Sequence, residues 1–214
     1  MTPFDSIFRS AHFIKSAEKL SQCPVDQGLE VAFAGRSNAG KSTTLNTLTD
    51  QKKLARTSKT PGRTQLINCF GLSVDNRRLI DLPGYGFAKV PIAMKINWQA
   101  HMQDYLMNRH SLAGVVLVMD IRHPLKEFDE LMLEWAKGNK MQVHVVLTKS
   151  DKLKRGPAKS TMLQVQKELK EREVIGSVQT FSSLSGDGID TLRIKLAGWL
   201  SFDNADEDIV PQKQ

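Results

Sequence analysis

The chain has 214 residues, of which 40% are hydrophobic and 25% are charged, as is typical of a soluble protein with one globular domain and short extensions. Its longest strongly apolar run, residues 112–119, is too short to cross a bilayer, and the N-terminus lacks the continuous apolar segment of a signal peptide. These features argue against membrane and secreted classes, so we expect a cytoplasmic monomer with no membrane partner.

The formal net charge is +7, but the charge is unevenly distributed. The last twelve residues carry −3, so the rest of the chain carries +10. This excess indicates a polyanionic partner, most simply nucleic acid. A solvated basic surface would have the same composition, and charge alone does not separate the two.

Strands and helices are expected to alternate along the chain. Apolar runs predict strands within residues 29–35, 65–72, 77–82, 112–120, 141–151 and 177–186. Helical spacing predicts helices at 41–50, before about 109, and at 125–139, 157–172 and 188–202. The pattern indicates a mostly parallel sheet covered on both faces, with one antiparallel pair supplied by a hairpin. We divide the chain into a lead-in (1–28), a globular domain (29–202) and an acidic tail (203–214) that we expect to be disordered.

A phosphate-binding loop is predicted between the first strand and the first helix, where the sequence reads GRSNAGKST. Glycines let successive N–H groups point at phosphate oxygens, and the helix N-terminus adds positive potential. Lys41 would contact the β- and γ-phosphates, and the Ser42 hydroxyl would bind Mg²⁺. The loop predicts a nucleoside triphosphate without identifying the base. The expected contacts are Gly35, Arg36, Ser37, Asn38, Ala39, Gly40, Lys41, Ser42 and Thr43.

A second motif begins forty residues after the loop, where an apolar strand ends at Asp81 and continues as Leu82, Pro83 and Gly84. The Asp81 carboxylate would reach Mg²⁺ through water. The Gly84 N–H would bond the γ-phosphate, and a glycine lets the following loop move when that phosphate leaves. The segment therefore predicts a metal ligand beside a nucleotide-sensing turn.

The base is predicted from the loop Thr148-Lys149-Ser150-Asp151, which follows another buried strand. The Asp151 carboxylate would accept hydrogen bonds from guanine N1–H and the 2-amino group. Adenine has an acceptor at N1 and no 2-amino group, so it would leave this carboxylate unpaired. A weaker signal follows the last strand, where a backbone N–H would bond guanine O6. This signal comprises Phe181, Ser182 and Ser183.

These motifs, with KTPGRTQ at 59–65 and DLPGYGFAKV at 81–90, resemble the EngB family of bacterial GTPases, within the TrmE–Era group. The likeness covers about residues 10–202. It implies an α/β fold, a three-layer P-loop G domain with a six-stranded, mostly parallel sheet, one antiparallel strand and helices on both faces. It also implies a GTPase acting in assembly of the large (50S) ribosomal subunit and linked to cell division and septation.

The resemblance also implies a switch threonine that meets Mg²⁺ and the γ-phosphate when GTP is bound. Thr64 is preferred because it lies between Gly62-Arg63 and the following strand, and Thr60 is the competing candidate. The neighbouring residues expected at the nucleotide are Gly62, Arg63, Gln65 and Leu66.

The sequence lacks the glutamine that orients the attacking water in Ras-like enzymes, because Tyr85 occupies that position. One reading is slow intrinsic hydrolysis, raised by a partner. In the other reading, the resemblance to TrmE-type GTPases implies that Asn38 helps to hold a K⁺ ion. This ion would offset the charge that develops between the β- and γ-phosphates. Asn38 capping a turn is the structural alternative. The residues expected to act in catalysis are Asn38, Lys41, Thr64 and Gly84.

Basic residues flank the nucleotide motifs in sequence and predict phosphate contacts to ribosomal RNA. They are Lys52, Lys53, Arg56, Lys59, Arg63, Lys152, Lys154 and Arg155. Two other classes stay open. A small-molecule kinase or ATPase would share the phosphate loop, although TKSD opposes it, and a GTP-sensing scaffold in division would need negligible hydrolysis.

Overall fold

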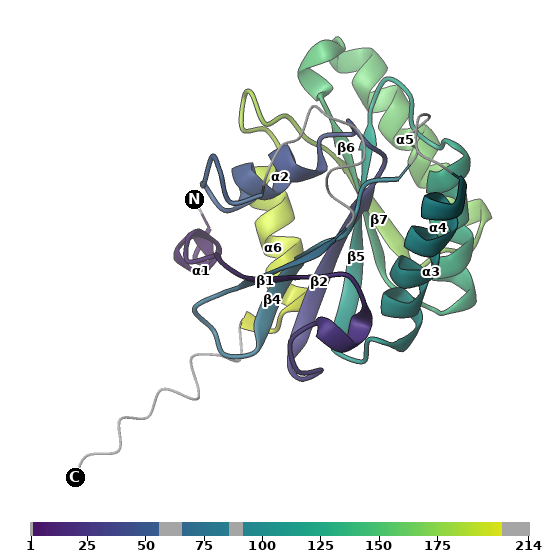
Figure 1. Ribbon diagram of the computed structural model, residues 1–214. Helices are drawn as coiled ribbons and strands as arrows, with labels where there is room; N and C mark the ends of the chain where they lie inside the picture. The colour runs from purple at the N-terminus through teal and green to yellow at the C-terminus, as the bar shows by residue number, and fades with distance from the viewer. Residues whose placement is uncertain (1, 56–65, 86–91, 203–214) are drawn as a thin grey trace.

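The computed structural model describes residues 2–55, 66–85 and 92–202, with backbone alone for 92–99. The described part is a three-layer α/β domain (Figure 1). Its strands are β1 (His12–Ala17), β2 (Leu29–Gly35), β3 (Ile67–Gly71), β4 (Arg77–Asp81), β5 (Leu112–Asp120), β6 (Val143–Thr148) and β7 (Gly176–Thr180). Its helices are α1 (Asp5–Arg9), α2 (Lys41–Leu48), α3 (Ile92–Asn108), α4 (Glu127–Gly138), α5 (Arg155–Glu171) and α6 (Ile189–Trp199), with short 3₁₀ turns η1 (Leu20–Gln22) and η2 (Ser150–Lys152).

The sheet has the strand order β1-β3-β4-β2-β5-β6-β7. Strands β4, β2, β5, β6 and β7 pair in parallel, and β3 runs antiparallel to both β4 and β1. The fold class, the hairpin and the single antiparallel strand are thus as predicted. The strand number was wrong, because the described residues form seven strands rather than six.

The additional strand is β1, which comes from the segment treated as a lead-in. Five of its six residues are exposed, so its sequence has no buried pattern that would reveal a strand. It is held by pairing with β3 from His12↔Gly71 to Ala17↔Ile67, with a bulge between Phe13 and Lys15. Long-range backbone hydrogen bonds, not local propensity, therefore define this strand.

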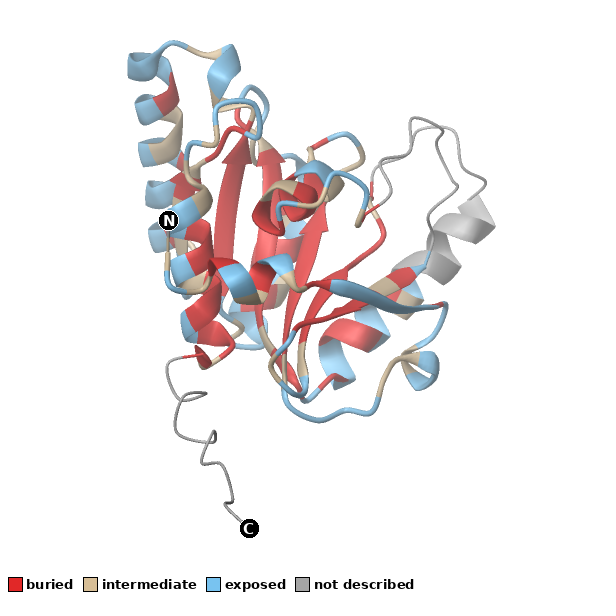
Figure 2. Cartoon of the chain, turned by 90° about the vertical axis from the view of Figure 1, so that its left-hand side faces the viewer, coloured by how far each residue is buried: buried red, intermediate tan, exposed pale blue. Residues whose placement is uncertain are grey.

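The strand side chains alternate between two hydrophobic cores, one on each face of the sheet. Ala32 and Ala34 of β2 pack toward α3, α4 and α5, whereas Val31 and Phe33 pack toward α1, α2 and α6. Figure 2 shows the buried strands in the middle and exposed helix residues facing outward. Burial on both faces explains why the central strands read as continuous apolar runs. No helix in the described part of the chain is both long and apolar enough to span a bilayer.

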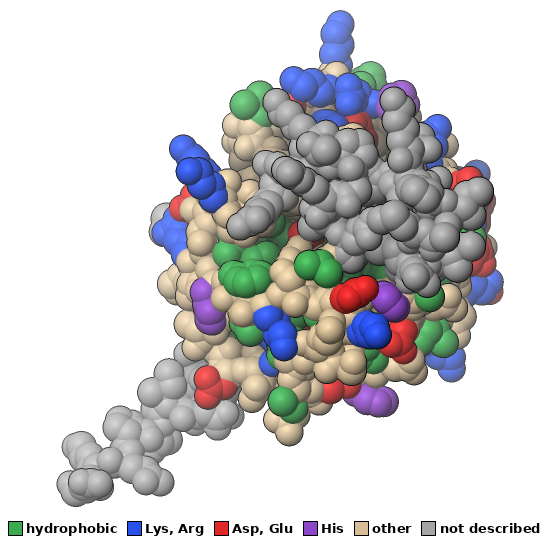
Figure 3. Space-filling view, viewed as in Figure 1, with side chains coloured by type: hydrophobic (Ala, Val, Ile, Leu, Met, Phe, Trp, Pro, Cys, Tyr) green, Lys and Arg blue, Asp and Glu red, His purple; other side chains and the backbone are tan. Residues whose placement is uncertain are grey.

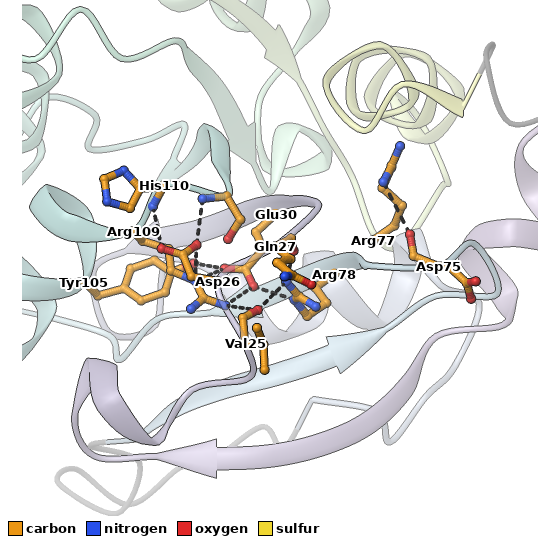
Figure 4. A network of polar contacts seen from close by, with 11 residues as sticks. Val25, Asp26, Gln27, Glu30, Asp75, Arg77, Arg78, Tyr105, Arg109 and His110 are labelled. Atoms are coloured by element: carbon orange, nitrogen blue, oxygen red, sulfur yellow. Dashed lines mark hydrogen bonds and ion pairs between the residues drawn. The ribbon is translucent and has the colours of Figure 1, made fainter.

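A buried ionic network fixes the amino end of β2 to β4 and to the end of α3 (Figure 4). Glu30 Oε1 accepts hydrogen bonds from Arg78 Nε at 2.5 Å and Arg109 Nη2 at 2.6 Å. Its Oε2 accepts from Arg109 Nε at 2.9 Å and from the Tyr105 hydroxyl at 2.7 Å. Burial raises the pKa of Glu30, but the hydrogen bonds from Arg109, Tyr105 and Arg78 outweigh it and hold this pKa below its ordinary value. This network lies at the opposite end of the sheet from the predicted nucleotide motifs.

Candidate nucleotide-binding site

Three predicted motifs meet at one edge of the sheet, because each follows the carboxyl end of a parallel strand. Gly35 ends β2, Asp81 ends β4 and Thr148 ends β6. Ligands of open parallel sheets bind at this edge, where the loops diverge. The fold therefore brings together loops that are separated by up to about a hundred residues in sequence.

The phosphate loop turns sharply between β2 and α2. Gly40 caps the helix with φ 98°, a left-handed conformation that glycine adopts without strain, and Asn38 also has a positive φ of 66°. Gly35 is required for a different reason, since a Cβ there would lie 2.6 Å from the Val118 carbonyl oxygen. The result is a helix N-terminus, half-buried at Gly40 and Ser42, whose positive end suits an anion.

Lys41 and Asp81 form a buried ion pair at the centre of the site. Both side chains are almost completely buried, and they come from the first turn of α2 and the end of β4. The ammonium group predicted to meet phosphate thus contacts the carboxylate predicted to meet Mg²⁺. On nucleotide binding, Lys41 would exchange the Asp81 carboxylate for phosphate, and Asp81 would exchange Lys41 for Mg²⁺. Neither buried charge would be left unpaired.

The Leu82-Pro83-Gly84 turn lies directly against the phosphate loop. Leu82 N–H donates to Phe33 O at 3.0 Å, and a Cβ on Gly84 would lie 3.5 Å from Ser37 Cα. Tyr85 continues this contact, because Ser37 N–H donates to Tyr85 O at 2.7 Å. The predicted phosphate-sensing turn is therefore placed to respond to a change in the loop.

The side chain of Tyr85 is buried, so it is not placed to orient an attacking water. Its hydroxyl donates to Asp129 Oδ1 at 3.1 Å, and its ring packs on Phe128 with centroids 5.5 Å apart. Burial, with a further contribution from the Asp129 carboxylate, raises the pKa of Tyr85 well above its ordinary value. Tyr85 is therefore a neutral, buried group that packs against α4.

The Thr148–Asp151 loop is attached to the phosphate loop by two side chains. Thr148 Oγ1 donates to Ala39 O at 2.5 Å, and Lys149 Nζ donates to Asn38 O at 2.8 Å. Lys149 adopts φ 59° and also pairs with Asp120 at 2.9 Å. The phosphate and base motifs thus form one connected unit.

Asp151 is poised to accept hydrogen bonds as a carboxylate. The hydroxyl of Ser182 donates to Asp151 Oδ1 at 2.8 Å, and this bond holds the pKa of Asp151 below its ordinary value. Ser150 N–H donates to Phe181 O at 3.1 Å, which joins this loop to the one after β7. The structure therefore brings the two predicted base-recognition loops together, with Ser182 buried and Ser183 exposed.

Asp120 was missed by the sequence reasoning. It ends β5 at the same sheet edge, where Arg122 and Lys149 donate to its carboxylate. The Arg122 hydrogen bond is the largest of the influences that lower the pKa of Asp120. An acidic residue closing an apolar strand was the available signal, the same signal that identified Asp81.

The residues present fit a magnesium ion, provided that the nucleotide phosphates and water supply part of its coordination. In the residues that the structure describes, no three His, Cys, Asp or Glu side chains gather into a metal site. Asp81 at the end of β4 and the half-buried Ser42 in the first turn of α2 supply oxygen atoms, which suits an ion whose coordination is completed by phosphates and water.

Part of the predicted site lies outside the described residues: Thr60, Gly62, Arg63, Thr64 and Gln65, with Arg56 and Lys59. Leu66 is described and exposed just before β3. The other predicted contacts are placed on the phosphate loop, with Arg36 and Ser37 half-buried and Thr43 exposed.

The chain is similar to known GTP-binding proteins. A family model described as "50S ribosome-binding GTPase" matches residues 30–149. A relative from Acinetobacter baylyi, "Probable GTP-binding protein EngB", is 56% identical over 187 residues, covering 87% of this chain and 79% of the relative.

Two solved structures support the fold. A crystal structure of a probable GTP-binding protein engB has a TM-score of 0.64 and 24% identity, covering 81% of this chain and 99% of that chain. A structure of Era in complex with MgGDPNP and nucleotides 1506–1542 of 16S ribosomal RNA has a TM-score of 0.62 and 23% identity, covering 81% of this chain and 57% of that chain.

Proposed function

Because the chain belongs to the EngB family of GTP-binding proteins, we propose that it acts as a GTP-driven switch in assembly of the large (50S) ribosomal subunit. The observation that carries this proposal is the match of residues 30–149 to a family described by its binding to that subunit. GTP-bound and GDP-bound forms would differ in affinity for an assembly intermediate.

The nucleotide would lie across the phosphate loop with its guanine at Asp151. Lys41 would leave Asp81 for the β- and γ-phosphates, and Gly84 N–H would bond the γ-phosphate. Ser42, Thr64 and Asp81, the last through water, would hold Mg²⁺, which neutralises charge on the phosphate oxygens when bound. The Lys41–Asp81 pair supports this arrangement, because the two charges are already adjacent.

Hydrolysis would be slow without an activator. The hydrogen bond from Tyr85 to Asp129 supports this, since it turns the side chain after Gly84 into the protein rather than toward water. Stimulation would come from the ribosomal partner or from K⁺ near Asn38, whose exposed side chain sits on the phosphate loop.

Ribosomal RNA would be contacted through basic residues beside the nucleotide edge. Those that the structure describes are exposed: Lys52, Lys53, Lys152, Lys154 and Arg155. Together with Arg56, Lys59 and Arg63 they would bind phosphates without reading sequence. Nucleotide-dependent changes at Thr64 would then alter RNA affinity.

The protein would act as a monomer in the cytoplasm, where ribosomes assemble, and its link to division and septation would follow from ribosome supply. A GTP-sensing scaffold in division is the second candidate. The buried Tyr85 favours it, because the site offers no glutamine after Gly84.

The test is GTP turnover by the purified chain in K⁺ and in Na⁺ buffer, each with and without large ribosomal subunits. We expect stimulation by subunits, with K⁺ raising the rate further. Asn38→Ala should remove the K⁺ effect and preserve GTP binding. Absence of turnover under every condition would refute the switch and favour the scaffold.

A further inference from the structure

A shallow groove separates the start of β1 from the loop that follows α2. It has a volume of about 580 Å³ and is lined by residues 11–13 on one side and 51–54 on the other. Gln51 Nε2 donates to Arg9 O at 2.9 Å and to Ala11 O at 2.6 Å, which fixes the two sides relative to each other. We call this feature the β1 groove.

The β1 groove contains an exposed aromatic ring. Phe13 is 55% exposed, and its ring meets Phe70 in an edge contact with centroids 6.1 Å apart. The neighbouring Ile14 is 41% exposed. A single exposed phenylalanine is unremarkable by itself, so the inference depends on what surrounds it.

Two lysines line the same groove. Lys52 and Lys53 are both exposed, and neither forms an ion pair with a residue that the structure describes. The described lining contains no acidic residue. Figure 3 shows a hydrophobic patch on the face that carries β1, with Lys and Arg side chains at several places around it and Asp and Glu side chains further along the same face. The surface therefore favours an anion that also has an apolar face.

The backbone of the loop that carries the lysines is held by the helix that starts at the phosphate loop. Asn46 Nδ2 of α2 donates to Lys52 O at 3.2 Å and to Ala55 O at 2.9 Å, and Ala55 N–H donates back to Asn46 Oδ1 at 2.7 Å. A fixed backbone lowers the entropic cost of binding a ligand here.

We propose that the β1 groove binds single-stranded RNA, with a base stacked on Phe13 and neighbouring phosphates on Lys52 and Lys53. Single-strand sites combine an aromatic platform with a positive groove in this way, because unpaired bases can present their faces. A duplex would offer phosphates alone and leave the ring unused. The inference rests on the proposed ribosomal function, to which it adds Phe13 and the preference for unpaired RNA.

The test measures fluorescence anisotropy of a short labelled oligouridylate and of an RNA duplex of equal length. We expect the single strand to bind more tightly. Phe13→Ala should weaken single-strand binding at least about fivefold and leave duplex binding unchanged. Lys53→Gln should lower the salt dependence of single-strand binding by about 0.7 in log–log slope. Leu131→Ala, an equally exposed apolar residue on α4, is the matched control and should have no effect.

Two further variants separate stacking from folding and from simple hydrophobic contact. Phe13→Trp should retain affinity, and its fluorescence should change on RNA binding, even if Phe13→Ala proves unstable. Phe13→Leu should bind as weakly as Phe13→Ala. Wild-type affinity in Phe13→Leu, or equal binding of strand and duplex, would overturn the proposal.

Sedimentation with large ribosomal subunits distinguishes this inference from the proposed function. Loss of subunit binding in Phe13→Ala with oligouridylate binding intact would mean a protein partner and overturn the RNA groove. If the wild-type chain fails to bind subunits but shows the Phe13-dependent strand preference, the ribosomal proposal fails and the chemistry of the groove stands.

Discussion

Two buried ion pairs lie near opposite ends of the parallel strands and are built differently. At the amino end, Glu30 accepts four hydrogen bonds from Arg78, Arg109 and Tyr105. At the carboxyl end, Lys41 is the one side chain in the described part of the chain that bonds the Asp81 carboxylate. A saturated network resists change, whereas a single contact can be exchanged. The comparison teaches that one end of the sheet holds the fold and the other is kept available for a ligand.

The largest effect should come from Glu30→Gln, which removes the charge at nearly constant volume. Arg78 and Arg109 would face an amide, and we expect the free energy of unfolding to fall by about 3–5 kcal/mol. Urea unfolding measures this. Glu171→Gln, at an exposed ion pair with Lys167 (3.5 Å), should cost less than about 1 kcal/mol. Equal losses in the two variants would break the comparison.

The matched change at the other end is Asp81→Asn. We expect GTP turnover to fall about 10²–10³-fold, because charge stabilisation at the phosphates is lost. The nucleotide-free protein should lose less stability than Glu30→Gln does, because one buried cation rather than two loses its charge partner and the amide oxygen still accepts from Lys41. Turnover within tenfold of the wild type would show that Asp81 belongs to the fold rather than to the site.

A third prediction concerns His144, which lies near the amino end of β6 and is satisfied as a neutral ring. It contacts Ser177 Oγ and Gln179 Oε1, each at 2.8 Å, and burial is the main cause that lowers its pKa to about 4. Between pH 6.5 and 4 the unfolded state therefore binds more protons, so stability should fall with falling pH by up to about 3 kcal/mol.

His144→Gln should remove this part of the pH dependence. Urea midpoints measured across that range should show a shallower slope for the variant than for the wild type. Parallel slopes would mean that the buried ring does not account for the acid sensitivity.

The smallest effect should come from Tyr85→Phe. Loss of the hydroxyl leaves Asp129 Oδ1 without its donor and should cost about 1 kcal/mol. Turnover should change less than about threefold, because the hydroxyl bonds α4 rather than water. A tenfold or larger loss of turnover with unchanged stability would give Tyr85 a catalytic role.

The sequence was sufficient where each element has a local pattern. The β3–β4 hairpin and the central strands were predicted from turn residues and apolar runs, and the site loops from glycine spacing and strand-terminal carboxylates. Strand β1 was missed because its residues are mostly exposed and show no apolar pattern. It is a strand because its backbone pairs with β3. Asp120 closes an apolar strand and could have been found by the signal that identified Asp81, whereas its pairing with Lys149 and the Tyr85–Asp129 bond join separate elements that meet only after folding.

The measurement that tests the central claim most directly is calorimetric binding of GTP and ATP, each with Mg²⁺, to the wild-type chain and to Asp151→Asn. The account predicts that the wild type prefers GTP by at least about tenfold, since a charged hydrogen bond contributes about 1.5–3 kcal/mol, and that Asp151→Asn loses most of this preference. Equal affinities for GTP and ATP in the wild type, or a preference that survives in Asp151→Asn, would contradict it.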